Sequence, residues 1–171
     1  PEIRQDLTNF LNKAGAKIKW IGKRSVEIKG VKKLNSVSYT VMSDRIECGT
    51  FCVMAAISNG ELKIHGLNPK FIRTELKLLK KVGAKIKAYD QSIFIKGPKK
   101  IKSIKFLETK EYDGFPTDLQ AQFMALLCKA NGRSVISESI FENRFKHVAE
   151  LKRLGAKISI IKNKAIFKSN S

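Results

Sequence analysis

The chain has 171 residues, 43% of them hydrophobic, which is enough to bury a core and excludes a disordered basic tail. Lysine and arginine number 34 against 15 aspartate and glutamate residues, so the net charge is +19. The longest apolar runs, MALLC and CVMAAI, are far shorter than the roughly 20 residues that cross a bilayer, and the N-terminal residues lack a signal-peptide pattern, so we expect a soluble cytoplasmic protein without a membrane partner.

The first predicted elements are a helix and a hairpin in residues 1–30. Leu7, Phe10 and Leu11 have helical spacing, and the tetrapeptide GAKI that follows begins with Gly15, which is expected to end the helix. Two extended stretches then predict a hairpin. This part of the chain therefore predicts the order helix, glycine stop, hairpin.

The same order recurs twice, each time behind a second helix and a strand. GAKI returns at Gly83 and at Gly155. The predicted elements are, in chain order, a helix over 48–60, a strand over 61–67, a helix over 71–79, a hairpin over 84–97, a helix over 117–132, a strand over 133–141, a helix over 148–154 and a hairpin over 156–169.

These two copies align at one constant offset along their length. The offset that relates Gly83 to Gly155 also relates Asn59-Gly60 to Asn131-Gly132. The repeat is therefore a whole folding unit, and we expect an α/β module of two helices and a sheet of roughly four strands. The first copy is present only as its second half, which indicates a piece of something longer.

Three cysteines, Cys48, Cys52 and Cys128, lie in apolar stretches without a CxxC spacing, and they are predicted to be core thiols. The two histidines, His65 and His147, have no neighbours that would complete a metal site. We expect neither a metal nor a cofactor.

The stretch GFPTDLQAQF, residues 114–123, places one carboxylate at a predicted helix start. Pro116 suits the first turn, Thr117 can cap the helix, and the helix dipole favours an ionised Asp118. Asp118 can therefore be a structural residue of the helix start or a catalytic group. Its partner in the preceding repeat is Ile46, so the fold of the unit does not require a carboxylate here.

Three stretches carry a family resemblance: DRIECGTFCVMAAI (44–57), DGFPTDLQAQFMAL (113–126) and FENRFKHVAELKRLGA (141–156). In order and spacing they resemble the enolpyruvyl transferases, specifically those that act on UDP-N-acetylglucosamine. The resemblance implies an inside-out α/β barrel of two lobes, each built from three repeated units. By that analogy, residues 1–43 end the upper, substrate lobe, whereas 44–99 and 100–171 are two units of an incomplete catalytic lobe.

The resemblance also implies a reaction, namely transfer of the enolpyruvyl group of phosphoenolpyruvate to the 3-hydroxyl of UDP-N-acetylglucosamine in peptidoglycan precursor synthesis. Asp118 matches the family's general base, Ile140 a residue that contacts the sugar nucleotide, and Arg144 an arginine that binds phosphoenolpyruvate. Without the resemblance, a salt bridge from Arg144 to a neighbour such as Glu142 would be the ordinary interpretation, and Phe141 is expected in the core.

The family's reactive cysteine belongs to an upper-lobe loop that no segment here resembles, and Cys48 does not match it. The chain alone is therefore expected to be inactive, with the missing parts of the same enzyme as its partners. Two alternatives remain: one fragment of a split enzyme, and a basic nucleic-acid-binding module. The lysines are scattered rather than gathered with aromatic residues on one face, which favours a solvated surface and no nucleic-acid partner.

Overall fold

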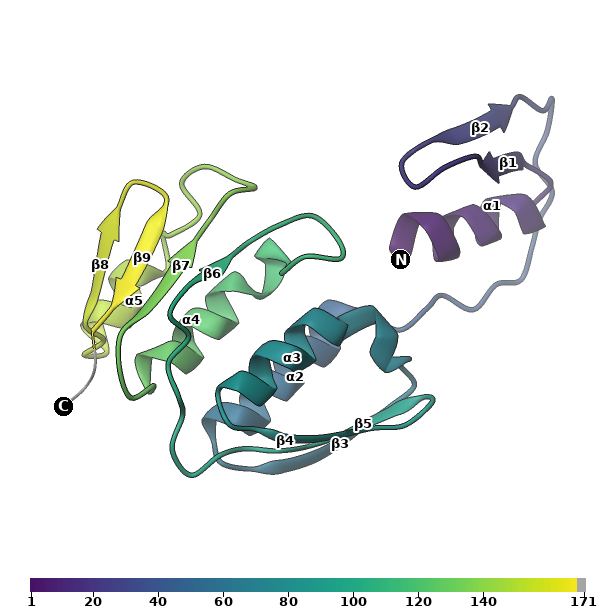
Figure 1. Cartoon of the computed structure of the whole chain (residues 1–171). Helices are drawn as coiled ribbons and strands as arrows, with labels where there is room; N and C mark the ends of the chain where they lie inside the picture. Colours follow the sequence, from purple (N-terminus) through teal and green to yellow (C-terminus); the bar gives the residue numbers. More distant parts are fainter. Residues whose placement is uncertain (169–171) are drawn as a thin grey trace. The chain divides into compact units, whose positions relative to one another are not determined.

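The computed structural model describes residues 1–168. The chain divides into two compact units, Pro1–Ser43 and Asp44–Ser171, which are described separately (Figure 1). The predicted final strand extends to Ser169, and that last residue lies outside the described part.

The first unit contains one helical segment and one hairpin. Its elements are the π-helical turn η1 (Glu2–Leu7), the helix α1 (Thr8–Lys13) and the antiparallel strands β1 (Lys17–Trp20) and β2 (Val26–Lys29). Gly15 has a φ of +99°, a conformation that residues with a Cβ rarely adopt, and it ends the helix as predicted. The indole nitrogen of Trp20 donates to the hydroxyl of Thr8 at 3.1 Å and ties the hairpin to the helix.

The second unit contains two helix pairs and two sheets. Its helical elements are α2 (Arg45–Ile57), the 3₁₀ turn η2 (Pro69–Ile72), α3 (Arg73–Lys81), the 3₁₀ turn η3 (Thr117–Leu119), α4 (Gln120–Cys128) and α5 (Val148–Arg153). Its strands are β3 (Glu61–His65), β4 (Lys85–Ala88), β5 (Ser92–Lys96), β6 (Leu107–Glu108), β7 (Ser134–Ser137), β8 (Ile158–Ile161) and β9 (Lys164–Phe167).

The sheets confirm the mixed α/β class. One sheet has the order β3-β5-β4 and is antiparallel; the other has the order β6-β7-β9-β8, with β6 and β7 parallel. A sheet of roughly four strands was predicted for each unit. The first sheet has only three strands in the described residues, because no strand equivalent to β6 pairs with β3.

The two repeats pack against each other through equivalent helices, α2 and α4 (Figure 1). The side-chain amide of Gln122 donates to the hydroxyl of Thr50 at 3.0 Å, and these two positions are 72 residues apart. Lys129 and Ile57 are also 72 residues apart, and Nζ of Lys129 donates to the main-chain oxygen of Ile57 at 3.2 Å. Contacts between equivalent residues support the prediction that the repeat is a folding unit.

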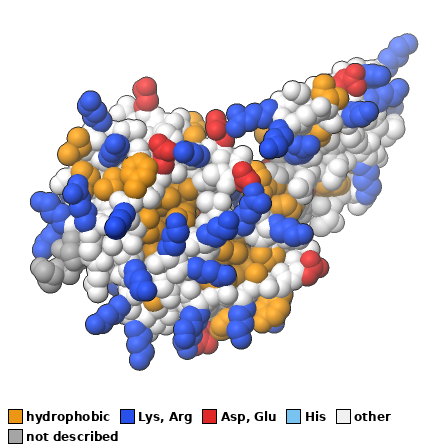
Figure 2. Space-filling model, viewed as in Figure 1, with side chains coloured by type: hydrophobic (Ala, Val, Ile, Leu, Met, Phe, Trp, Pro, Cys, Tyr) orange, Lys and Arg blue, Asp and Glu red, His pale blue; other side chains and the backbone are white. Residues whose placement is uncertain are grey.

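Positive charge is spread over the visible face of the molecule (Figure 2), and equivalent apolar residues of α2 and α4 differ in exposure. Figure 2 shows lysine and arginine side chains distributed across the visible face, with hydrophobic patches between them. Phe123 of α4 is fully buried, but its counterpart in α2, Phe51, is 42% exposed. None of the helices formed by residues 1–168 has the length and hydrophobicity that a membrane span requires.

Candidate functional site

Asp118 lies in η3, directly before α4, and its side chain is 55% exposed. Pro116, which has an extended backbone, precedes the turn, and no side chain caps it. The prediction that Thr117 caps this helix is wrong. Thr117 is the first residue of the turn, Pro116 occupies the cap position, and the hydroxyl of Thr117 donates to the carboxylate of Glu138 at 2.8 Å.

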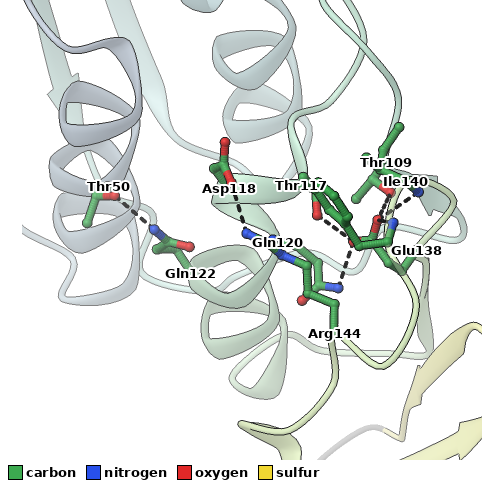
Figure 3. Close-up of polar contacts among 10 residues, drawn as sticks. Thr50, Thr109, Thr117, Asp118, Gln120, Gln122, Glu138, Ile140 and Arg144 are labelled. Atoms are coloured by element: carbon green, nitrogen blue, oxygen red, sulfur yellow. Dashed lines mark hydrogen bonds and ion pairs between the residues drawn. The ribbon is translucent and has the colours of Figure 1, made fainter.

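Arg144 forms an ion pair with Asp118, with 2.8 Å between Nη2 and Oδ1 (Figure 3). The two residues are 26 positions apart in the sequence. Among the described residues Arg144 pairs with Asp118 and not with Glu142, the neighbour that sequence reasoning offered as its ordinary partner. The fold therefore brings together the two charged residues that the family resemblance singled out.

The segment between β7 and α5 differs from its prediction. The predicted strand over 133–141 is too long, because β7 ends at Ser137, whereas α5 begins at Val148, where the helix over 148–154 was predicted. Asn143 has a φ of +55°, outside the helical region, so the helix does not extend back from Val148 through this residue. Arg144 consequently lies in a series of turns.

Phe141 is exposed rather than part of the predicted core, with 54% of its surface accessible. The turns hold its ring outside the packed interior, and the guanidinium carbon of Arg144 lies 5.1 Å from the ring centroid. This distance suits a cation–π contact. Phe141 therefore contacts Arg144 at the surface of the molecule.

A hollow of about 1090 Å³ lies beside this segment. It is lined by residues from two places in the second unit, 138–146 and the β8–β9 hairpin, and Ile140 and Arg144 both contribute to it. Asp118 is not among the lining residues. Ile140 is half-buried and its backbone N–H donates to Glu138 at 2.9 Å. The hollow is large enough for a small-molecule ligand.

Glu138 is a residue that sequence reasoning missed. It is 3% exposed and accepts hydrogen bonds from side chains and backbone of three segments (Figure 3). Burial raises the pKa of its carboxyl, but the hydrogen bonds from Thr117, Thr109 and the N–H groups of Ile140 and Phe141 lower it by more, so the net pKa lies below its ordinary value. Nothing in its sequence neighbours, Ser137 and Ser139, indicates a buried charge.

The predicted core position is confirmed for Cys48 and Cys52, which are both buried, whereas Cys128 is only partly buried. Burial and the hydrogen bond to Cys48 raise the pKa of the Cys52 thiol, with the hydrogen bond as the larger cause. Within residues 1–168 no three His, Cys, Asp or Glu side chains come close enough to hold a metal ion together.

Curated relatives match this chain over nearly its whole length. It is 58% identical over 170 residues to the UDP-N-acetylglucosamine 1-carboxyvinyltransferase of Pelagibacter ubique, and 48% identical over 168 residues to that of Geotalea uraniireducens. These alignments cover 99% and 98% of this chain but 40% of each relative. The chain thus spans about two fifths of the length of the curated relatives it matches.

Solved structures of low sequence identity share the fold. The enolpyruvyl transferase NikO from Streptomyces tendae has a TM-score of 0.82 at 21% identity, covering 95% of this chain and 39% of that one. An EPSP synthase from Acinetobacter baumannii has a TM-score of 0.66 at 21% identity, covering 96% of this chain and 40% of that one.

A family model agrees with both sets of relatives. The model described as EPSP synthase (3-phosphoshikimate 1-carboxyvinyltransferase) matches residues 1–171. The resemblance that the three motifs carry is thereby confirmed, and the chain belongs to the EPSP synthase (3-phosphoshikimate 1-carboxyvinyltransferase) family.

Proposed function

We propose that this chain is part of an enzyme that transfers the enolpyruvyl group of phosphoenolpyruvate to the 3-hydroxyl of UDP-N-acetylglucosamine, with release of phosphate. The observation that carries the proposal is the contact between Asp118 and Arg144, a carboxylate and a guanidinium that come from distant segments and meet at the surface. The names of the relatives that are 48–58% identical support the choice of substrates. Such a reaction would serve peptidoglycan precursor synthesis.

Asp118 has the role of general base. A sugar hydroxyl is a weak nucleophile, and a carboxylate that accepts its proton makes the oxygen able to attack. The oxygen and a proton add across the enol double bond, and phosphate and a proton then leave, so the enolpyruvyl ether and phosphate balance the two substrates. The exposure of Asp118 supports this role, because the carboxylate is accessible to a substrate.

Arg144 has the role of binding the anionic phosphoenolpyruvate. A guanidinium has five N–H donors in a planar fork, and its contact with Asp118 uses Nη2. An incoming carboxylate or phosphate can therefore bind the other donors and compete with Asp118 for the positive charge. Binding of the substrate anion would in this way loosen the ion pair and make Asp118 available to the hydroxyl.

Ile140 has the role of contacting the sugar nucleotide. Its half-buried side chain contributes to the hollow that also includes Arg144, so an apolar surface and a cation face the same space. Ligand sites commonly combine an apolar lining with a few placed polar groups.

The chain supplies only part of the proposed active site. Residues 1–43 would end the upper lobe, and 44–99 and 100–171 would be two units of the catalytic lobe, with the other catalytic groups on segments that this chain does not contain. We propose a cytoplasmic location. The chain alone is expected to be inactive, and its partners are then the remaining parts of the same enzyme.

The test is a phosphate-release assay with phosphoenolpyruvate and UDP-N-acetylglucosamine, on the full-length protein and on the isolated chain. We expect release that depends on both substrates in the full-length protein only. Absence of release from the full-length protein would refute the proposed function. Steeply salt-dependent binding of DNA or RNA would instead favour the nucleic-acid alternative.

A further inference from the structure

The carboxylate of Glu138 joins the segments that carry the three proposed site residues, and this arrangement suggests a role beyond packing. We infer that Glu138 is a positioning residue, which holds the turn of Asp118 and the segment of Ile140 and Arg144 in one fixed arrangement. The inference rests on the proposed function for its kinetic consequence.

The two oxygens of the carboxylate bind different parts of the site (Figure 3). Oε1 accepts from the hydroxyl of Thr109 at 2.8 Å and from the backbone N–H groups of Ile140 at 2.9 Å and Phe141 at 3.2 Å. Oε2 accepts from the hydroxyl of Thr117 at 2.8 Å and from the side-chain amide of Gln120 at 3.0 Å. One side chain therefore links η3, the start of α4 and the segment after β7.

These contacts act directly on the neighbours of the proposed catalytic residues. Thr117 precedes Asp118 and Gln120 follows it by two positions, so the bonds to Oε2 fix the turn on both sides of the base. The bonds to Oε1 fix the backbone from which Arg144 reaches back to Asp118. Because all of these hydrogen bonds converge on one buried side chain, the turn and the segment after β7 are held together through a single group.

Glu138 is itself anchored to the β8–β9 hairpin. Its backbone N–H donates to the main-chain oxygen of Asn163 at 2.8 Å, and the side-chain amide of Asn163 donates to the main-chain oxygen of Glu138 at 3.0 Å. The carboxylate therefore extends from a backbone that cannot move freely, as a positioning residue requires.

The preceding repeat shows that the fold does not need this network. At the repeat offset of 72 residues, Gly66 stands in place of Glu138 and Cys48 in place of Gln120. In that copy the helix start is held by Asp44, which accepts from the N–H groups of Ile46 and Glu47 at 2.7 and 3.2 Å. The Glu138 network occurs in the copy that carries Asp118, which links it to the site rather than to the unit.

The experiment compares Glu138→Ala and Glu138→Gln in the full-length protein. Glu138→Ala removes every bond of the network, and we expect kcat to fall about 10- to 100-fold and KM for phosphoenolpyruvate to rise, because small displacements of reacting groups have such effects. Glu138→Gln keeps an oxygen for the N–H groups of Ile140 and Phe141. Its new amide can donate to Thr117 and, once the side-chain amide of Gln120 turns over, to Oε1 of Gln120, which has no partner among the described residues. Activity is therefore expected to stay within a few-fold of wild type.

The matched control is Glu75→Ala, which removes another buried carboxylate. Glu75 lies in α3, is 2% exposed and faces Arg45 at 3.6 Å. This control is expected to lower stability while leaving kcat and KM near wild type, so a general loss of stability cannot imitate the effect at Glu138.

Two kinetic outcomes would overturn the inference. The first is wild-type kcat and KM in Glu138→Ala. The second is an equal loss of activity in Glu138→Ala and Glu138→Gln, which would indicate that the charge itself is required. A wild-type protein that releases no phosphate would refute the proposed function instead. In that case hydrogen exchange of the backbone N–H groups of Ile140 and Phe141 tests the positioning role alone. If Glu138 holds this segment, these groups exchange faster in Glu138→Ala than in Glu138→Gln. Equal exchange in the two variants would contradict it.

Discussion

A structural and a catalytic role of Asp118 predict effects of different size. A structural role in the ion pair with Arg144 affects the free energy of unfolding, whereas a catalytic role affects turnover. The two side chains are 55% and 38% exposed, so solvent screens the pair, and double-mutant cycles on such pairs give about 0.2–1 kcal/mol of coupling. A general base is worth more, and its loss is expected to lower turnover at least about 100-fold, or roughly 2.7 kcal/mol of barrier. The kinetic effect of removing Asp118 is therefore expected to exceed the effect on stability.

The assay is a double-mutant cycle with Asp118→Asn, Arg144→Gln and the double variant in the full-length protein. Unfolding free energies from denaturant titration give the coupling, and phosphate release gives turnover. Added salt is expected to reduce the coupling further, because both charges are in contact with solvent. A coupling above about 2 kcal/mol, or full turnover in Asp118→Asn, would show that the pair is structural and would refute the reasoning.

Three further predictions concern single residues. Gly97→Ala is expected to destabilise the fold by about 2 kcal/mol or more, because a Cβ would overlap the main-chain oxygen of Ala55, whereas Gly30→Ala, with open space around it, is expected to change stability by under about 0.5 kcal/mol. Arg144→Lys is expected to raise KM for phosphoenolpyruvate without changing the melting temperature, because an ammonium cannot bind an anion in bidentate fashion. Although burial raises the pKa of Glu138, its hydrogen bonds lower it below the ordinary 4.5, so its stabilisation is complete above that pH and is lost as the pH falls through the folded-state value. Acid titration of unfolding is expected to show a smaller loss for Glu138→Gln than for wild type.

The helices and hairpins could be predicted because their signals are local. Each GAKI glycine ends a helix in a positive-φ conformation, at +99°, +109° and +92° for Gly15, Gly83 and Gly155. Asp44 caps α2 through two backbone N–H groups in the same local way. Such features depend on residues within one turn of each other, and a single sequence contains them in full.

The errors occur where distant residues compete with local preferences. Thr117 has the chemistry of a cap, but the turn begins one residue too early for that role, and the Thr117 hydroxyl donates to Glu138, 21 positions away in the sequence. Arg144 has an acidic neighbour but pairs with Asp118 across 26 positions. Phe141 is hydrophobic, yet the turns around it keep it on the surface. Glu138 itself was missed because three of the groups that donate to its carboxylate belong to distant segments. Only the N–H groups of Ile140 and Phe141 are its neighbours in the sequence.

The repeat also has an evolutionary consequence. At the repeat offset of 72 residues, Ile46 and Ile72 occupy the positions of Asp118 and Arg144. Ile72 is fully buried and Ile46 packs against the core. A duplicated unit thus lets one copy keep apolar residues where the other copy exposes a charged pair. Selection on the first copy acts through packing, and selection on the second acts through chemistry, so the two halves of one domain are expected to accept different substitutions at the same structural positions.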